Sequence, residues 1–155
     1  MKGKRFGIYL VFLLIPLAVG GLGALVTMAG MPNYQELNKP FFTPPALLFP
    51  LVWGVLYVLM GIGGARVWIY GAGQRALPMV LFGFQLILNF LWTFWFFGAE
   101  LYLLSFLWLL LLLVVIGWMI HAFFTVDKWA GRLQIPYLLW CCFAAVLTFA
   151  IFLLN

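Results

Sequence analysis

The segment Leu37-Asn38-Lys39-Pro40-Phe41-Phe42-Thr43-Pro44-Pro45 (LNKPFFTPP) separates the first two long apolar stretches of this chain. Proline fixes its own φ and biases the residue before it away from the helical region. The segment is therefore expected to be stiff and non-helical. Pro45 fits the first turn of the next helix, where a missing N–H costs little.

Five stretches without a charged residue make up most of the sequence, which is 68% hydrophobic and 7% charged. Soluble domains carry about 25% charged residues, so a water-soluble fold could not hide this much apolar surface. Each stretch reaches the roughly 20 residues that a helix needs to cross about 30 Å of hydrocarbon. The sequence predicts an all-α integral membrane protein, a single domain over 1–155 surrounded by a lipid bilayer. Its five transmembrane helices are expected at roughly 6–28, 46–68, 76–97, 102–125 and 133–154, with the long first connection over 29–45.

The basic residues fix the expected orientation. In a five-helix topology only Lys39 falls on one side, and the other side holds Lys2, Lys4, Arg5, Arg66, Arg75, Lys128 and Arg132. The positive-inside rule then places the N-terminus in the cytoplasm and the C-terminus outside, with a bacterial cytoplasmic membrane as the expected location. The net charge of +5 reflects this topology, and no nucleic acid partner is expected.

Residues for enzymatic or metal chemistry are sparse. His121 could ligate a haem iron, although hydrogen-bonded packing is the favoured interpretation of one histidine in a membrane helix. Cys141 and Cys142 are adjacent and point about 100° apart around their helix, which argues against a metal site. The three acidic residues all fall in predicted loops: Glu36, Glu100 and Asp127. We expect no catalytic residue, no metal and no cofactor.

Three of the predicted helices carry stripes that mix aromatic and hydrogen-bonding side chains at spacings of three or four residues. The stripes are Phe49, Trp53 and Tyr57; Gln85, Asn89 and Trp92; and Tyr137, Trp140 and Ala144. The stripes could simply fill the bundle, with the two amides joining helices. Together with the stiff first connection, they favour a shared apolar pocket with few polar groups. Its lid would be Pro40, Phe41, Phe42, Pro44 and Pro45, although a rigid helix cap is the alternative.

Small residues recur in the first two predicted helices. Small side chains let helices approach closely in lipid. We therefore expect close packing at positions such as Gly20, Gly61, Gly63 and Gly64.

The ordered set of motifs resembles the TspO/translocator protein family. The first signature is Tyr34-x-x-Leu37-x-Lys39-Pro40-x-Phe42-x-Pro44-Pro45, followed by Phe49, Trp53 and Leu56-Tyr57. The other two are Gln85-Leu86-x-x-Asn89-x-x-Trp92 with Phe96-Phe97, and Pro136-Tyr137-x-x-Trp140-x-x-x-Ala144. Two positions depart from the family pattern, because Asn33 and Phe42 stand where tryptophans are usual.

The resemblance implies a five-helix bundle, usually a homodimer, that binds porphyrins and drug-like isoquinoline or benzodiazepine ligands beneath its first loop. It implies a transport or sensory role for a membrane receptor or carrier of tetrapyrroles such as protoporphyrin IX. The implied pocket residues are Tyr34, Trp53, Tyr57, Asn89, Trp92, Trp140 and Ala144. Lys39, the only cation expected on the loop side, is the candidate partner of a porphyrin propionate. Two alternatives remain, a light- or oxygen-dependent porphyrin-degrading enzyme and a ligand-free regulatory membrane protein.

Overall fold

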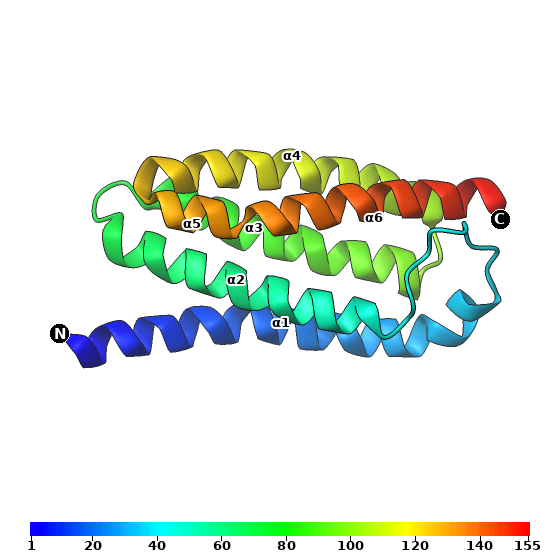
Figure 1. Cartoon of the computed structure of the whole chain (residues 1–155), viewed down its shortest axis with the longest axis horizontal. Coiled ribbons are helices and arrows are strands. Elements are labelled where there is room, and N and C mark those ends of the chain that lie inside the picture. Colours follow the sequence, from blue (N-terminus) through cyan, green and yellow to red (C-terminus); the bar gives the residue numbers. More distant parts are fainter.

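The computed structural model describes all 155 residues, and it is a bundle of long helices without strands (Figure 1). The elements are α1 (Lys2–Glu36), α2 (Leu48–Tyr70), α3 (Ala76–Thr93), the π-helix η1 (Phe94–Gly98), α4 (Tyr102–Val126), α5 (Lys128–Leu133) and α6 (Ile135–Leu154). η1 continues α3, and α5 leads into α6, so the chain forms five spans that are long and apolar enough to cross a membrane. The predicted all-α, five-span architecture is confirmed.

The first connection is shorter than predicted. α1 continues to Glu36, so the expected loop over 29–45 is wrong, and the first loop covers 37–47. Pro32 lies inside α1, where proline removes one backbone hydrogen bond. Tertiary packing holds this end of the helix, because Tyr34 is buried and a Cβ at Gly30 would lie 2.2 Å from the Phe97 carbonyl oxygen.

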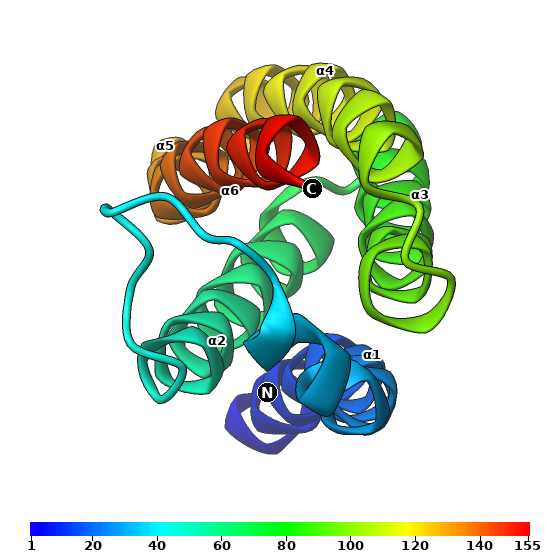
Figure 2. The same ribbon diagram turned by 90° about the vertical axis from the view of Figure 1, so that its right-hand side faces the viewer.

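The helices are not packed evenly around the bundle axis (Figure 2). α1 packs along α2 and against η1, and α4 packs against α3, α5 and α6. The backbones of α2 and α6 hardly approach each other, and aromatic side chains make the contacts between these helices. The separation of the two backbones leaves a groove between them on the surface of the bundle.

Glycines mark the closest approaches between helices, as the sequence indicated. A Cβ at Gly61 would lie 2.6 Å from the carbonyl oxygen of Phe12, so α1 and α2 touch backbone to backbone there. A Cβ at Gly20 would lie 2.4 Å from the ring of Tyr57. In lipid, such close contact replaces the hydrophobic driving force that packs helices in water.

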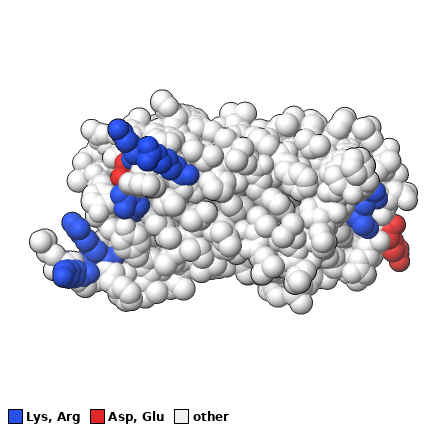
Figure 3. All heavy atoms as spheres, in the orientation of Figure 1, with Lys and Arg blue, Asp and Glu red and all other residues white.

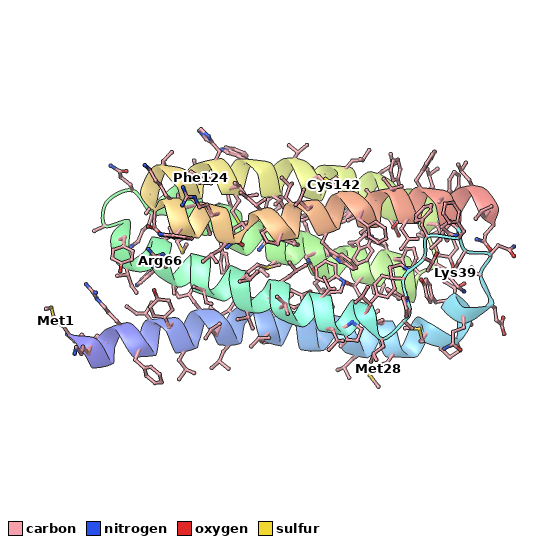
Figure 4. All side chains as sticks on the ribbon, in the orientation of Figure 1. Met1, Met28, Lys39, Arg66, Phe124 and Cys142 are labelled. Carbon is pink, nitrogen blue, oxygen red and sulfur yellow. The ribbon has the colours of Figure 1, made fainter.

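Charged side chains are confined to the two ends of the bundle (Figure 3). Near one end, Arg66 and Asp127 form a two-bond ion pair, with Nη2 of Arg66 3.1 Å from Oδ1 of Asp127. Asp127 also accepts a hydrogen bond from the backbone N–H of Ala130, which caps α5. The hydrogen bonds from Arg66 lower the pKa of the Asp127 carboxyl below its ordinary value. Lys39 lies at the opposite end, in the first loop (Figure 4).

Replacing Gly61 by alanine should destabilise the bundle, because the new methyl group would overlap the backbone of α1. Overpacking of this kind costs about 1–3 kcal/mol. Gly54 on the same helix has no atom within 4 Å of a built Cβ and is the matched control. Denaturant unfolding in detergent micelles should show a loss for Gly61→Ala and little change or a small gain for Gly54→Ala. Equal effects would contradict the packing at Gly61.

Candidate ligand-binding site

A chain of buried hydrogen bonds connects α2, α3 and α6. The Tyr57 hydroxyl donates to Oδ1 of Asn89 at 2.9 Å, and Nδ2 of Asn89 donates to the Tyr137 hydroxyl at 2.9 Å. The Tyr137 hydroxyl in turn donates to Oε1 of Gln85 at 2.7 Å. All four side chains are buried. We call these four residues the polar network.

The polar network shows how the two amides of α3 are used. Gln85 and Asn89 hydrogen-bond to tyrosines of neighbouring helices and so join these helices to α3. This was one of the two interpretations that the sequence left open. The nitrogen of the same amide, Nε2 of Gln85, donates to the sulfur of Met60 at 3.8 Å, and a thioether sulfur is a weak acceptor. Direct ligand contact by Gln85 or Asn89 remains a prediction.

The predicted aromatic residues meet on one side of this network. Trp53 stacks on Tyr57 at a centroid distance of 5.6 Å and lies 6.1 Å from Trp92. Phe49 contacts the rings of Tyr34 at 6.5 Å and Trp140 at 5.9 Å. Through such pairs, the structure assembles an aromatic cluster from Tyr34, Phe49, Trp53, Tyr57, Trp92, Phe96, Tyr137 and Trp140.

Three buried donors of the aromatic cluster have no hydrogen-bond partner. They are the Tyr34 hydroxyl and the indole Nε1 atoms of Trp92 and Trp140. Each buried donor without a partner costs about 1–3 kcal/mol. By contrast, Trp108 donates from its indole to the Leu88 carbonyl at 2.9 Å. The cluster therefore holds three donors, on α1, α3 and α6, that an acceptor group could satisfy.

Two other buried atoms without partners lie outside the cluster. They are the indole nitrogen of Trp95, which packs on Trp108, and the amide oxygen of Gln134 at the α5–α6 junction. Neither residue was predicted as part of a site. Three of the five unpartnered buried atoms thus belong to predicted site residues.

A groove of about 550 Å³ lies beside the cluster, between α2 and α6. Its volume falls within the roughly 300–1,000 Å³ typical of small-molecule sites. Several of its apolar side chains are exposed on the surface, so it opens sideways toward the expected hydrocarbon of the bilayer. The lining residues are Leu51, Val52, Val55, Leu56, Pro136, Leu139, Trp140 and Phe143.

Of the residues that line this groove, only Trp140 was predicted from the sequence to be a ligand-binding residue. Leu51, Val55 and Leu139 are apolar residues on membrane helices, and nothing in the sequence distinguishes such residues from ordinary lipid-facing ones. Ala144, which was predicted to line the pocket, is buried at 7% exposure and does not line the groove.

The predicted lid reaches the groove through one aromatic residue. The ring of Phe42 lies 6.3 Å from Phe143, which lines the groove, whereas Phe41 is fully exposed. Pro40 accepts both hydrogen bonds of Thr43 in a local turn. Pro44 lies in the same non-helical stretch. Pro45 lies three residues before α2 rather than in its first turn, and its carbonyl accepts from the N–H of Leu48 at 2.9 Å.

Lys39 caps the end of α1. Its Nζ donates to the carbonyl oxygens of Tyr34 at 2.9 Å, Gln35 at 3.0 Å and Leu37 at 3.1 Å. It also lies 5.0 Å from the ring centroid of Tyr34. A cation at the carbonyl end of a helix is favourable, and these bonds use all three of its N–H donors.

Five spans, a buried polar network and an aromatic cluster beside a lateral groove define an integral membrane protein with a candidate site inside its helix bundle. A profile of the TspO/MBR family matches residues 12–154. The chain belongs to this family.

Relatives occur in bacteria, archaea and animals. The chain is 39% identical to the tryptophan-rich protein TspO of Chlorobaculum tepidum, with 90% of each chain covered. It is 38% identical to the tryptophan-rich protein TspO of Archaeoglobus fulgidus, over 92% of this chain and 94% of that protein. It is 34% identical to the translocator protein of Sus scrofa, over 90% of this chain and 85% of that protein.

Tyr137→Phe should destabilise the bundle more than Tyr57→Phe. The first change leaves two buried atoms unpaired, Nδ2 of Asn89 and Oε1 of Gln85, and the second leaves only Oδ1 of Asn89. Each unpaired buried group costs about 1–3 kcal/mol. The free energy of unfolding of both variants in micelles tests the order. A loss for Tyr57→Phe as large as that for Tyr137→Phe would refute the central position of Tyr137.

Proposed function

We propose that this protein is a membrane receptor or carrier for tetrapyrroles such as protoporphyrin IX, and that it also accepts drug-like isoquinoline or benzodiazepine ligands. The observation that carries the proposal is the set of three unpartnered donors in the aromatic cluster beside the groove. The printed names of relatives, translocator protein and tryptophan-rich sensory protein, support a transport or sensory role.

The chemistry of a porphyrin matches the groups that the site offers. Its broad aromatic face can stack on indole and phenol rings. Its peripheral carboxylates are hydrogen-bond acceptors, and the free groups of the cluster are the donors of Tyr34, Trp92 and Trp140. Drug-like amides and lactams present a carbonyl acceptor on an apolar body, which suits the same donors. A lateral opening suits ligands that partition into the bilayer.

Trp140→Phe should weaken protoporphyrin IX binding about three- to tenfold, because it removes a donor whose hydrogen bond is worth about 0.5–1.5 kcal/mol. Trp118 on α4 lies outside the cluster at 54% exposure, so Trp118→Phe is the matched control. Quenching of tryptophan fluorescence in lipid nanodiscs measures both affinities. No binding to the wild-type protein would reject the proposed function, and equal losses would remove Trp140 from the site. Porphyrin absorbance in light and dark separates binding from the alternative of porphyrin degradation.

Lys39 contributes to this site through the loop that it anchors. Because its ammonium group is bonded to three backbone carbonyls, Lys39→Ala should loosen the first loop whatever the ligand charge. We expect a similar loss of affinity for protoporphyrin IX and for its dimethyl ester, measured by the same fluorescence titration. A loss confined to the dicarboxylic form would instead identify Lys39 as the propionate partner.

The distribution of charge supports a cytoplasmic N-terminus. The end of the bundle that holds the N-terminus also holds the Arg66–Asp127 pair, and the first loop lies at the other end (Figures 3 and 4). We propose that the loop and Asn155 face outward from a bacterial cytoplasmic membrane. Labelling of single cysteines in intact cells tests this orientation.

A homodimer is also proposed. Gly83 on α3 has no atom within 4 Å of a built Cβ, so another helix could approach closely there. Crosslinking in lipid at high protein density should give dimers. A product that is only monomeric would count against the dimer.

A further inference from the structure

We propose that Asn155 is a positioning residue that latches the first loop over the groove and thereby slows ligand exchange. The latch itself follows from contacts within the chain. Its effect on ligand exchange rests on the proposed function.

The latch consists of hydrogen bonds between the first loop and the end of α6. The backbone N–H of Asn38 donates to Oδ1 of Asn155 at 3.0 Å, and Nδ2 of Asn155 donates to the Asn38 carbonyl at 2.9 Å. One side-chain amide thus satisfies both backbone groups of a single loop residue. The same Nδ2 donates to the Ile151 carbonyl at 2.8 Å, which ties the amide to its own helix.

Apart from the latch, few hydrogen bonds hold the first loop in place. Lys39 anchors the α1 end of the loop, and the carbonyl of Pro45 meets the start of α2. Between these points the hydrogen bonds of residues 40–47 are local, made by Thr43 to Pro40. The hydrogen bonds that join the loop to the end of α6 are those of Asn38 with Asn155 and with the Leu154 carbonyl.

The path of the loop explains why the latch matters for the groove. From the end of α1 the loop passes the C-terminal end of α6 and then crosses to α2 (Figures 1 and 2). The groove lies between these same two helices, whose backbones stay apart, and the ring of Phe42 lies 6.3 Å from the ring of Phe143, which lines the groove. Holding Asn38 against α6 therefore keeps Phe42 near the groove.

The latch is suited to opening and closing. Asn38 and Asn155 are exposed, so water can replace their mutual hydrogen bonds at little net cost. A side-chain amide suits position 155 because it both donates and accepts, whereas a carboxylate only accepts. At position 38 the two shorter bonds use the backbone, and the side chain adds one longer contact of 3.4 Å to the Leu154 carbonyl.

Because the latch uses the side chain of Asn155 but the backbone of Asn38, substitutions at the two positions form matched variants. Asn155→Ala removes the latch, and Asn155→Asp keeps the acceptor and loses the donor. Asn38→Ala keeps both backbone bonds. In nanodiscs, the exchange rate of the Asn38 amide proton should rise about three- to tenfold in Asn155→Ala, the size expected for one or two exposed hydrogen bonds. In Asn38→Ala, the residue 38 amide should stay within about twofold of wild type, relative to its intrinsic rate.

The dissociation rate of protoporphyrin IX, followed by recovery of tryptophan fluorescence, is the second readout. It should rise in the order Asn38→Ala, Asn155→Asp, Asn155→Ala, while the melting temperatures stay equal. An unchanged amide exchange rate in Asn155→Ala would overturn the latch. Faster amide exchange with an unchanged dissociation rate would overturn its control of the groove. If the wild-type protein binds no porphyrin, the proposed function fails, and the exchange rates still decide the latch.

Discussion

The hydroxyl group of Tyr137 is the point on which the arrangement of the bundle depends. It accepts from Asn89 and donates to Gln85, and Asn89 accepts in turn from Tyr57. Apolar side chains gain nothing by leaving lipid for a protein interface, so the rotation of each helix must be fixed by close packing and by polar pairs. The polar network fixes the faces that α2, α3 and α6 turn inward. The aromatic rings three or four residues away on the same helices then meet in one cluster.

The buried polar groups of the candidate site fall into two sets, those that hydrogen-bond to one another and those without a partner. The amides and hydroxyls of the polar network bond to one another and hold the helices. The hydroxyl of Tyr34 and the indoles of Trp92 and Trp140 are buried and have no hydrogen-bond partners. Lys39 and Asn155 both hold the part of the first loop next to α1, Lys39 through carbonyls at the end of α1 and Asn155 through the backbone of Asn38. In the proposed function, stability and ligand recognition use different residues of one connected region.

Much of this arrangement could be predicted from the sequence. Runs without charge define the five spans, and spacings of three and four brought Trp53, Asn89 and Tyr137 to one place. The start of the first loop was wrong, because packing of Gly30 and Tyr34 keeps α1 helical past Pro32. The groove could not be predicted, since it arises from the separation of α2 and α6, which depends on contacts that neither helix shows alone. The three backbone carbonyls that bind Lys39 could not be predicted either, because every residue has a carbonyl and the sequence does not show which ones a side chain reaches.

The indole N–H resonances of the tryptophans test the central claim most directly. Titration of isotope-labelled protein in nanodiscs with protoporphyrin IX should move the indole protons of Trp92 and Trp140 downfield as they gain an acceptor. The indole of Trp108 already donates to Leu88 and should keep the shift of a hydrogen-bonded proton, which makes it an internal reference. Downfield shifts confined to Trp92 and Trp140 would support a site built on unpartnered donors. Unchanged indole shifts for Trp92 and Trp140 at saturating porphyrin would contradict it.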